Sequence, residues 1–205
     1  MIKSKFFLPF AVACAAMVTG CVSSSSSSDL SATGNSTVPE KISTPEEFMD
    51  ASIKELYSTV QKVYQTEYFA LGIPDGWNVV TFNNAPLDSS ISVEKADKST
   101  MVTVRINKAV RPTIKETCDL AAEGYRANGV EFTSKPEVAY GTCIIEGRES
   151  EQDVALWLRQ YDDDNSIYTI NYTGSLENVG QLLGYLTGNE KLMQLMVRPI
   201  GGGAL

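Results

Sequence analysis

The chain has 205 residues, of which 43% are apolar, 20% charged and 9% aromatic, a composition typical of one soluble globular domain with additional segments. Seventeen basic against 25 acidic residues give a formal charge of −8, which argues against a nucleic-acid partner. The chain contains no histidine, which excludes Ser-His-Asp and Cys-His catalysis, His-bound zinc and imidazole general bases.

Residues 1–20 have the features of a secretory signal peptide. Lys3 and Lys5 precede an apolar run over 6–18, which is too short to cross a bilayer as a helix. The run ends in Val18-Thr19-Gly20-Cys21, which resembles the lipobox of bacterial lipoproteins. This resemblance implies cleavage after residue 20 and a lipid on Cys21 that anchors the protein to a membrane. The alternative is an ordinary secreted protein in which Cys21 is a free thiol.

The sequence predicts four segments along the chain. After the signal peptide comes a lipidated, flexible tether over 21–42, which contains an unbroken serine run at 23–28. A single folded domain follows over 43–200, and a glycine-rich flexible tail over 201–205. Val22 after the lipidated cysteine, in place of Asp, favours the outer membrane, facing the periplasm, if the host is Gram-negative.

The domain is expected to begin with a helix over 45–66. Thr44-Pro45-Glu46-Glu47 reads as an N-cap, a first-turn proline and a capping-box glutamate. An apolar stripe follows at helical spacing, formed by Met49, Ile53, Leu56, Val60 and Val63. The period then changes to that of a strand over 69–73, and a turn is expected at Ile73-Pro74-Asp75-Gly76, with Pro at its second position, just before Trp77.

The remaining elements alternate between strands and two helical regions. A second helix is marked by the capping box Thr113-Ile114-Lys115-Glu116 and by the stop signal Asn128-Gly129. A closing helical region is expected over 175–196, bent at Gly188-Asn189. Strands are expected over 91–96, 101–110, 130–133, 138–146, 154–161 and 167–173.

The last two strands predict how the sheet is covered. Around a four-residue loop, Trp157 lies opposite Ile170 and Arg159 opposite Tyr168 on one face. A second apolar face is formed by Val154, Leu156, Leu158 and Ile167. Other elements must therefore pack on both faces of the sheet to bury these apolar side chains. The predicted fold class is α+β, an antiparallel β-sheet flanked by helices on both faces, which is an α/β/α sandwich.

The segment Tyr68-Phe69-Ala70-Leu71-Gly72-Ile73-Pro74-Asp75-Gly76-Trp77 resembles the opening of PsbP-like domains, including those of DcrB-like bacterial lipoproteins. These domains have an apolar strand, a P-x-G-W turn, two strands, a helix, several strands and a closing helix, and the same order is expected here from 68 to 196. The N-terminal helix over 45–66 departs from the family pattern. The resemblance implies a non-catalytic accessory or binding domain of the cell envelope, without a shared set of catalytic residues.

Two cysteines remain in the mature domain, Cys118 and Cys143. An exported pair usually oxidises, and a bond between these residues closes a loop of about 26 residues, worth about 3.5 kcal/mol. The alternative is a pair of buried free thiols. Two cysteines without histidine do not make a tetrahedral zinc site, so no metal and no cofactor is expected.

Three further groups of residues are candidate sites. Asp162, Asp164 and Ser166 match the first positions of a calcium loop, but Ile167 and Thr173 replace its required Gly and Glu, so a solvated turn is preferred. A carboxylate group in an expected loop is read as solvated rather than catalytic: Glu146, Glu149, Glu151 and Asp153. An aromatic group is read as sheet core, with a ligand or partner groove as the alternative: Trp157, Arg159, Tyr168 and Tyr172.

The favoured hypothesis is a membrane-anchored envelope lipoprotein that is not an enzyme and acts on another envelope component, which we expect to be a protein. One alternative is a lipid-anchored enzyme using carboxylate or serine chemistry without histidine. The other is a surface-exposed adhesion or virulence factor. Cleavage after residue 20 removes two lysines and leaves 15 basic against 25 acidic residues, so lipid and not surface charge must hold the protein at an anionic membrane.

Overall fold

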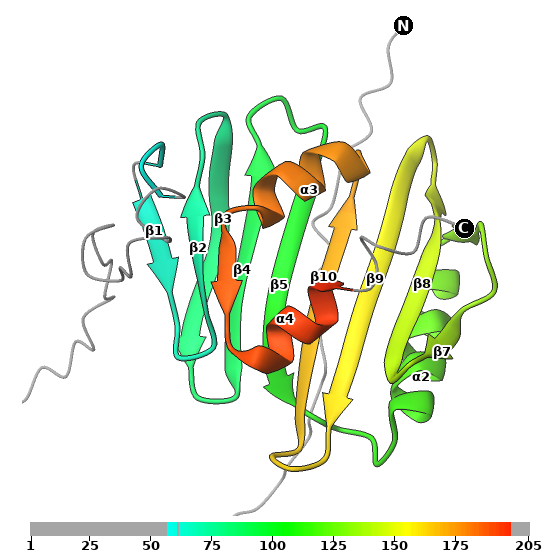
Figure 1. Cartoon of the computed structure of the whole chain (residues 1–205). Coiled ribbons are helices and arrows are strands. Elements are labelled where there is room, and N and C mark those ends of the chain that lie inside the picture. Colours follow the sequence, from blue (N-terminus) through cyan, green and yellow to red (C-terminus); the bar gives the residue numbers. More distant parts are fainter. Residues whose placement is uncertain (1–56, 61, 198–205) are drawn as a thin grey trace, which may run out of the picture. The chain divides into compact units, whose positions relative to one another are not determined.

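The structure is a computed structural model of the chain, and it describes residues 57–60 and 62–197. These residues form an α+β fold with two antiparallel sheets and three helices (Figure 1). The predicted α+β class and antiparallel sheet are therefore confirmed. The predicted signal peptide, lipobox, tether and tail, and the start of the expected helix over 45–66, lie outside the described residues.

The large sheet has eight strands in the order β3-β4-β5-β10-β9-β8-β6, with β7 also paired to β8. Its strands are β3 (Trp77–Ala85), β4 (Asp88–Lys95), β5 (Met101–Lys108), β6 (Glu131–Phe132), β7 (Glu137–Ala139), β8 (Thr142–Glu149), β9 (Gln152–Tyr161) and β10 (Ser166–Thr173). The β9–β10 hairpin has the predicted register, with Trp157 opposite Ile170 and Arg159 opposite Tyr168.

The small sheet has the order β1-β2-β11 and packs against one face of the large sheet. Its strands are β1 (Lys62–Gln65), β2 (Phe69–Ile73) and β11 (Leu186–Gly188). Alternate residues of β2 point to opposite sides: Phe69 and Leu71 enter the main core, whereas Ala70 packs with Tyr57 on the outer side. The strand predicted at 69–73 is confirmed.

The main core lies between the large sheet and a layer made of the small sheet, α3 (Leu176–Leu183) and α4 (Glu190–Val197). Leu182 of α3 and Leu192 and Leu195 of α4 are fully buried against this face, which also carries Trp157 and Tyr168. Both helices lie over the same side of the sheet in Figure 1. Residues of β1, β2 and β3, the strands that border the candidate site, belong to this core.

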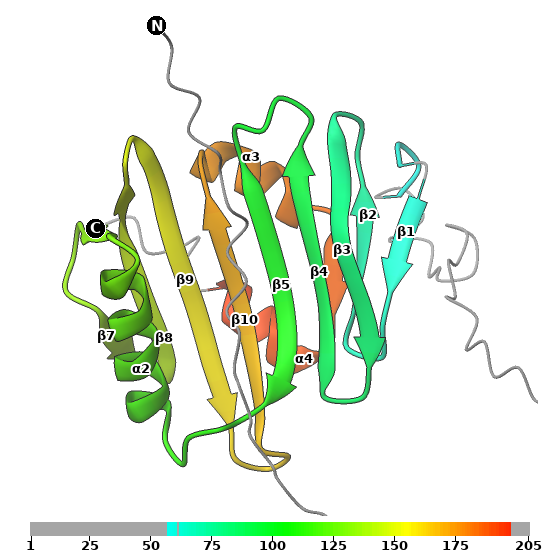
Figure 2. The same cartoon turned by 180° about the vertical axis from the view of Figure 1, so that it is seen from behind.

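The opposite face of the large sheet carries α2 (Ile114–Ala127) at the β8–β9 end (Figure 2). Cys118 and Ala122 of α2 pack with Leu156 and Leu158 of β9 and with Ile145 of β8. The helix begins as predicted, because the Thr113 hydroxyl accepts a hydrogen bond from the Glu116 backbone N–H at 3.2 Å. Asn128 is its C-cap, and the next residue, Gly129, has a φ of 85°.

Beyond α2, the second face is polar. Ser92 of β4 and Thr103 of β5 share a side-chain hydrogen bond of 2.9 Å, and exposed Arg105 bridges to Asp88 at 3.3 Å. The described helices leave this part of the face uncovered, as Figure 2 shows along β3, β4 and β5. An antiparallel sheet tolerates this because one of its faces can be solvated.

The expected helix over 45–66 is wrong at its C-terminal end. Residues 57–59 form a turn, and Lys62–Gln65 is strand β1, paired with β2. Val63 points to the outer core and Tyr64 to the main core, which is the alternation of a strand. The spacing of Val60 and Val63 fits a helix, but the turn at 57–59 and the pairing of Lys62–Gln65 with β2 prevent one.

Two other expected elements are divided in the structure. The strand expected over 138–146 is a hairpin, because Tyr140 and Gly141 both have positive φ, 53° and 79°, and form a two-residue turn between β7 and β8. The helical region expected over 175–196 contains strand β11 between α3 and α4. The break predicted at Gly188-Asn189 is located correctly, since the Asn189 side chain accepts from the Leu192 N–H at 3.1 Å where α4 starts.

Candidate functional site

The chain passes from the small sheet to the large sheet through a tight corner at Pro74–Trp77. The Trp77 N–H donates to the Pro74 carbonyl at 3.3 Å, and Gly76 has a φ of 81°. The turn predicted here is confirmed, but it starts one residue later than expected, with Pro74 first and Gly76 third. A positive φ at the third position favours glycine. The Gly76 carbonyl accepts from the Ala96 N–H at 2.8 Å, which ties the corner to the end of β4.

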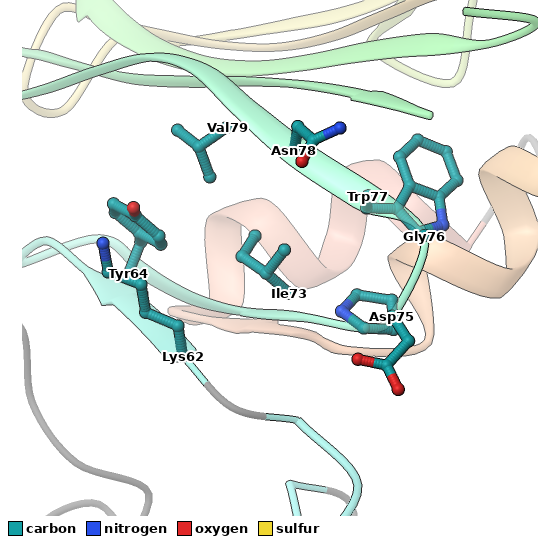
Figure 3. Close-up of a pocket in the computed structure, with 9 residues that line it drawn as sticks. Lys62, Tyr64, Ile73, Asp75, Gly76, Trp77, Asn78 and Val79 are labelled. Atoms are coloured by element: carbon teal, nitrogen blue, oxygen red, sulfur yellow. The ribbon is translucent and has the colours of Figure 1, made fainter. Parts of the chain in front are cut away.

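A slot of about 240 Å³ lies beside this corner, between β1–β2 and β3 (Figure 3). In Figure 3 the side chains of Tyr64, Ile73 and Val79 point into the space between the two sheets. The lining is formed by Lys62, Tyr64, Ile73, Pro74, Asp75, Gly76, Trp77, Asn78 and Val79. The slot is therefore an opening into the margin of the main core, where the two layers separate.

Local contacts hold the walls of the slot in place. The Tyr64 ring packs edge-on against Phe82, with the ring centroids 5.0 Å apart, and the Lys62 ammonium lies 4.6 Å from the Tyr64 ring centroid. Trp77 is buried and belongs to the main core. Aromatic rings fixed by such contacts form a rigid wall, and the ammonium leaves a positive charge at the rim.

The size and chemistry of the slot suit recognition by insertion. Its volume is below the range of about 300–1,000 Å³ typical of pockets for drug-sized ligands. It has room for one bulky side chain or a small molecule. The lining exposes more polar than apolar surface, with polar groups from Lys62, Asp75 and Asn78 beside the side chains of Tyr64 and Ile73, so it suits a side chain that has both polar and apolar atoms.

The aromatic residues singled out from the sequence lie elsewhere. Trp157, Tyr168 and Tyr172 are all buried in the main core, and Trp157 packs edge-on against Tyr172 at 5.7 Å. Arg159 is half-buried and lies 5.5 Å from the ring of Tyr161, so its cation–π partner is a residue that sequence reasoning did not choose. The Trp157 indole N–H has no hydrogen-bond partner in the described part of the chain.

Two of the three aspartates of the β9–β10 turn form ion pairs with one lysine of α4. Lys191 donates to Asp163 and Asp164, both at 2.7 Å. Burial opposes the charged form of Asp164, but its hydrogen bonds with Lys191 and Ser166 outweigh this effect and lower its pKa. A lysine occupies the position where a cation would bind, and the described residues contain no group of three or more potential ligands placed to hold a metal.

The predicted carboxylate group surrounds the β8–β9 hairpin instead of a loop. Glu146 and Glu149 lie on β8, Asp153 lies on β9, and Glu151 is in the turn. Arg148 donates to Asp153 at 2.8 Å on the exposed surface. Burial, with nearby Glu146 and Asp153, raises the pKa of Tyr172 to about 12.

Cys118 and Cys143 form a disulfide, so the expected pairing is confirmed. The bond joins α2 to β8 across the second core, and both residues are buried. Cys21 lies outside the described residues.

The slot itself was not predicted. The sequence predicts a turn at Ile73–Gly76, but its pattern places Lys62 and Tyr64 in a helix and Val79 in no element. The β-branched and aromatic pair Val63-Tyr64, just before the strand predicted at 69–73, is the signal that could have placed β1 beside β2.

Comparisons with known proteins give little further guidance. No protein-family model matches the chain, and no curated protein matches it. A crystal structure from Bacteroides thetaiotaomicron VPI-5482 matches with a TM-score of 0.33 and 12% identity, over 60% of this chain and 46% of that one. The chain thus spans less than half of that structure, and a TM-score this low carries no argument about fold or function. In the part of the chain that the structure describes, no helix is long and apolar enough to span a membrane.

Proposed function

We propose that this chain is an envelope lipoprotein anchored through a lipid on Cys21, whose domain binds or assists another envelope component without catalysis. The disulfide between Cys118 and Cys143 carries the proposal, because such bonds form and persist in oxidising compartments such as the bacterial periplasm. It supports the exported location that the signal peptide and lipobox predict. The favoured location is the outer membrane, facing the periplasm.

We further propose that the domain is an α/β/α sandwich of the PsbP-like type. The packing of α2 on one face, and of α3 and α4 on the other, supports this assignment. The corner Pro74–Trp77, which carries the resemblance, connects the two sheets and borders the slot. The segment that suggested the family is thus also a wall of the candidate site.

A binding role fits the chemistry of the slot. The lining has one amine, one carboxylate, one amide and aromatic and aliphatic side chains, which suits non-covalent recognition. We propose that the partner is a protein of the cell envelope, with no cofactor and no nucleic acid involved. Tethering both partners to one membrane raises their effective concentration, so a weak contact suffices.

The test is photo-crosslinking in the native host. A photo-reactive amino acid is placed, one position at a time, on several elements, for example at exposed Asn78 and Leu120 and at half-buried Thr169. Captured proteins are then identified. A binding module gives a reproducible adduct with an envelope protein from at least one position. Absence of adducts from every position, in cells that hold normal amounts of the protein, would contradict the proposal.

A further inference from the structure

The long strand β3 forms a free edge of the large sheet. Trp77–Ala85 is nine residues long and pairs with β4 on one side, and among the described residues nothing pairs with it on the other. It contains no charged residue and no proline. Its sequence is Trp-Asn-Val-Val-Thr-Phe-Asn-Asn-Ala.

Edge strands are normally protected against pairing with other chains by short length, charge, proline or bulges. The other edge strands of the described fold follow this rule: β1 has four residues, β7 and β11 have three each, and β6 has two. β3 has more than twice the length of any of these, which makes it the described edge best suited to accept an added strand.

A bulge modifies β3 without closing its edge. The register shifts between Val79 and Thr81, so that Val79 and Phe82 both face the main core while Val80 is 53% exposed. On either side of the bulge, β3 pairs regularly with β4. Regular backbone of this kind presents N–H and C=O groups to the solvent side in the spacing that a further strand requires.

The slot lies beside this edge and shares residues with it. Trp77, Asn78 and Val79 belong to both β3 and the slot lining. Strand addition gains affinity from backbone hydrogen bonds and specificity from pockets that receive alternate side chains. Here one pocket of about 240 Å³ stands next to one open edge.

We propose that an extended segment of a partner protein adds to the free edge of β3 and places one large side chain, with both polar and apolar atoms, in the slot. This inference rests on the proposed binding role and specifies how that binding occurs. The segment is uncharged or basic, because the edge itself is uncharged and the chain is acidic, with a net charge of −8.

The observations favour a short segment over a second copy of this chain. Nine residues at about 3.3 Å each give an edge about 30 Å long and one strand wide. Stable contacts between folded proteins bury about 1,200–2,000 Å², far more than one such edge supplies. Two copies would in addition bring like net charges together.

The test uses a display library of random linear nonapeptides, panned against the protein expressed from its complete sequence and purified in detergent. Enriched peptides are synthesised with a fluorophore, and binding is followed by fluorescence anisotropy. We expect the enriched peptides to share one large residue with a polar end, such as tyrosine, at a fixed place in an extended pattern. Failure to enrich any peptide would overturn the proposal.

Two variants and one control locate the binding. Val80→Lys adds a charge to the edge, and Asn78→Trp places a ring at the mouth of the slot; each should weaken peptide binding at least tenfold. Leu120→Lys makes the same apolar-to-basic change at a residue of α2 that is 46% exposed, and should leave the affinity unchanged. Circular dichroism verifies folding, and Thr81→Lys replaces Val80→Lys if the latter unfolds. Equal binding by the folded edge variants would overturn the proposal.

Two further outcomes separate this inference from the proposed function. Light scattering that finds a dimer which Val80→Lys dissociates would assign the edge to a second copy and overturn the partner segment. In cells, adducts formed from Leu120 or Thr169 but not from a photo-reactive residue at position 80 would retain the binding role and refute docking at β3. Adducts at position 80 that the Asn78→Trp variant loses would support it.

Discussion

Single residues determine the geometry of the corner beside the slot. Gly76 has a φ of 81°, and an added Cβ there would meet nothing within 4 Å. Any cost of substitution therefore comes from the backbone conformation and not from a clash. Gly180 offers the matched comparison, since it lies within α3 and also has open space around it.

We expect Gly76→Ala to lower the free energy of unfolding by about 1–2 kcal/mol, because left-handed backbone is unfavourable for residues with a Cβ. Gly180→Ala should raise it by about 0.5–1 kcal/mol, because alanine is the better helix former. Urea unfolding measures both. If the two variants shift stability in the same direction, the backbone of the corner is not under the stated constraint.

Two tyrosines, half-buried Tyr125 and buried Tyr172, link the stability of the fold to alkaline pH. Burial raises the pKa of Tyr125 to about 12, partly offset by a hydrogen bond with Asn171, and burial raises that of Tyr172 to about 12 as well. Both values exceed the ordinary value of 10, so the folded state holds these protons longer than the unfolded state does.

It follows that stability is unaffected by these groups below pH 10 and falls as the pH rises from 10 towards 12. We expect each tyrosine to cost about 1 kcal/mol of unfolding free energy at pH 11 relative to pH 8. Urea unfolding at the two pH values measures the loss, and tyrosinate absorbance at alkaline pH follows the titration. Tyr125→Phe should reduce the loss by its share; an unchanged pH dependence would show that Tyr125 titrates normally.

At the scale of elements, local signals predicted well and long-range pairing did not. The start of α2 at Thr113 and the β9–β10 register follow from a cap and a four-residue turn, both of which act over a few residues. β1 and β11 exist because each pairs with β2, and Gly188 and Leu192 fit closely where β11 meets α4. β11 pairs with a strand far away in the sequence, which no short window contains. β1 pairs with the strand that follows it, but it reads as helix because Val60 and Val63 continue the helical spacing.

The sequence does not predict the slot, because residues 62–65 read as helix and not as the strand β1. Its corner was visible in the sequence as a turn, but its opposite wall comes from Lys62 and Tyr64, which only the pairing of β1 with β2 brings to β3. The disulfide could be predicted because export leaves just two cysteines in the mature domain, so the pairing needs no three-dimensional information.

The disulfide gives a quantitative prediction for the contact of α2 with the sheet. It closes a loop between residues separated by 25 positions, for which chain entropy predicts about 3.5 kcal/mol. We expect the double variant Cys118→Ala/Cys143→Ala to lose about 3 kcal/mol of unfolding free energy, with hydrogen exchange accelerated in α2 more than in α3.

Reduced wild-type protein is the control, because it lacks the bond but keeps both side chains and the packing of the second core. It should show most of the same loss. If reduction leaves stability and exchange in α2 unchanged, tertiary packing alone holds the helix against β8.

At the scale of the whole molecule, charge and anchoring act together. The chain is acidic, so its surface is repelled by anionic lipid. Under the proposed function, the lipid predicted on Cys21 provides the membrane association. Two or three acyl chains hold a protein stably where a single myristoyl chain binds reversibly.

We therefore expect Cys21→Ser to move the protein from the membrane fraction to the soluble fraction, or to leave it unprocessed with its signal peptide, and to abolish labelling by radioactive palmitate. Cys14→Ser changes a cysteine inside the predicted signal peptide and should leave labelling and fractionation as in the wild type. The Cys118–Cys143 bond should still form in exported Cys21→Ser protein, because oxidation depends on the compartment and not on the lipid. Palmitate labelling and membrane association that persist in Cys21→Ser would refute the anchor, and with it the argument that lipid overcomes the repulsion of an acidic domain from an anionic surface.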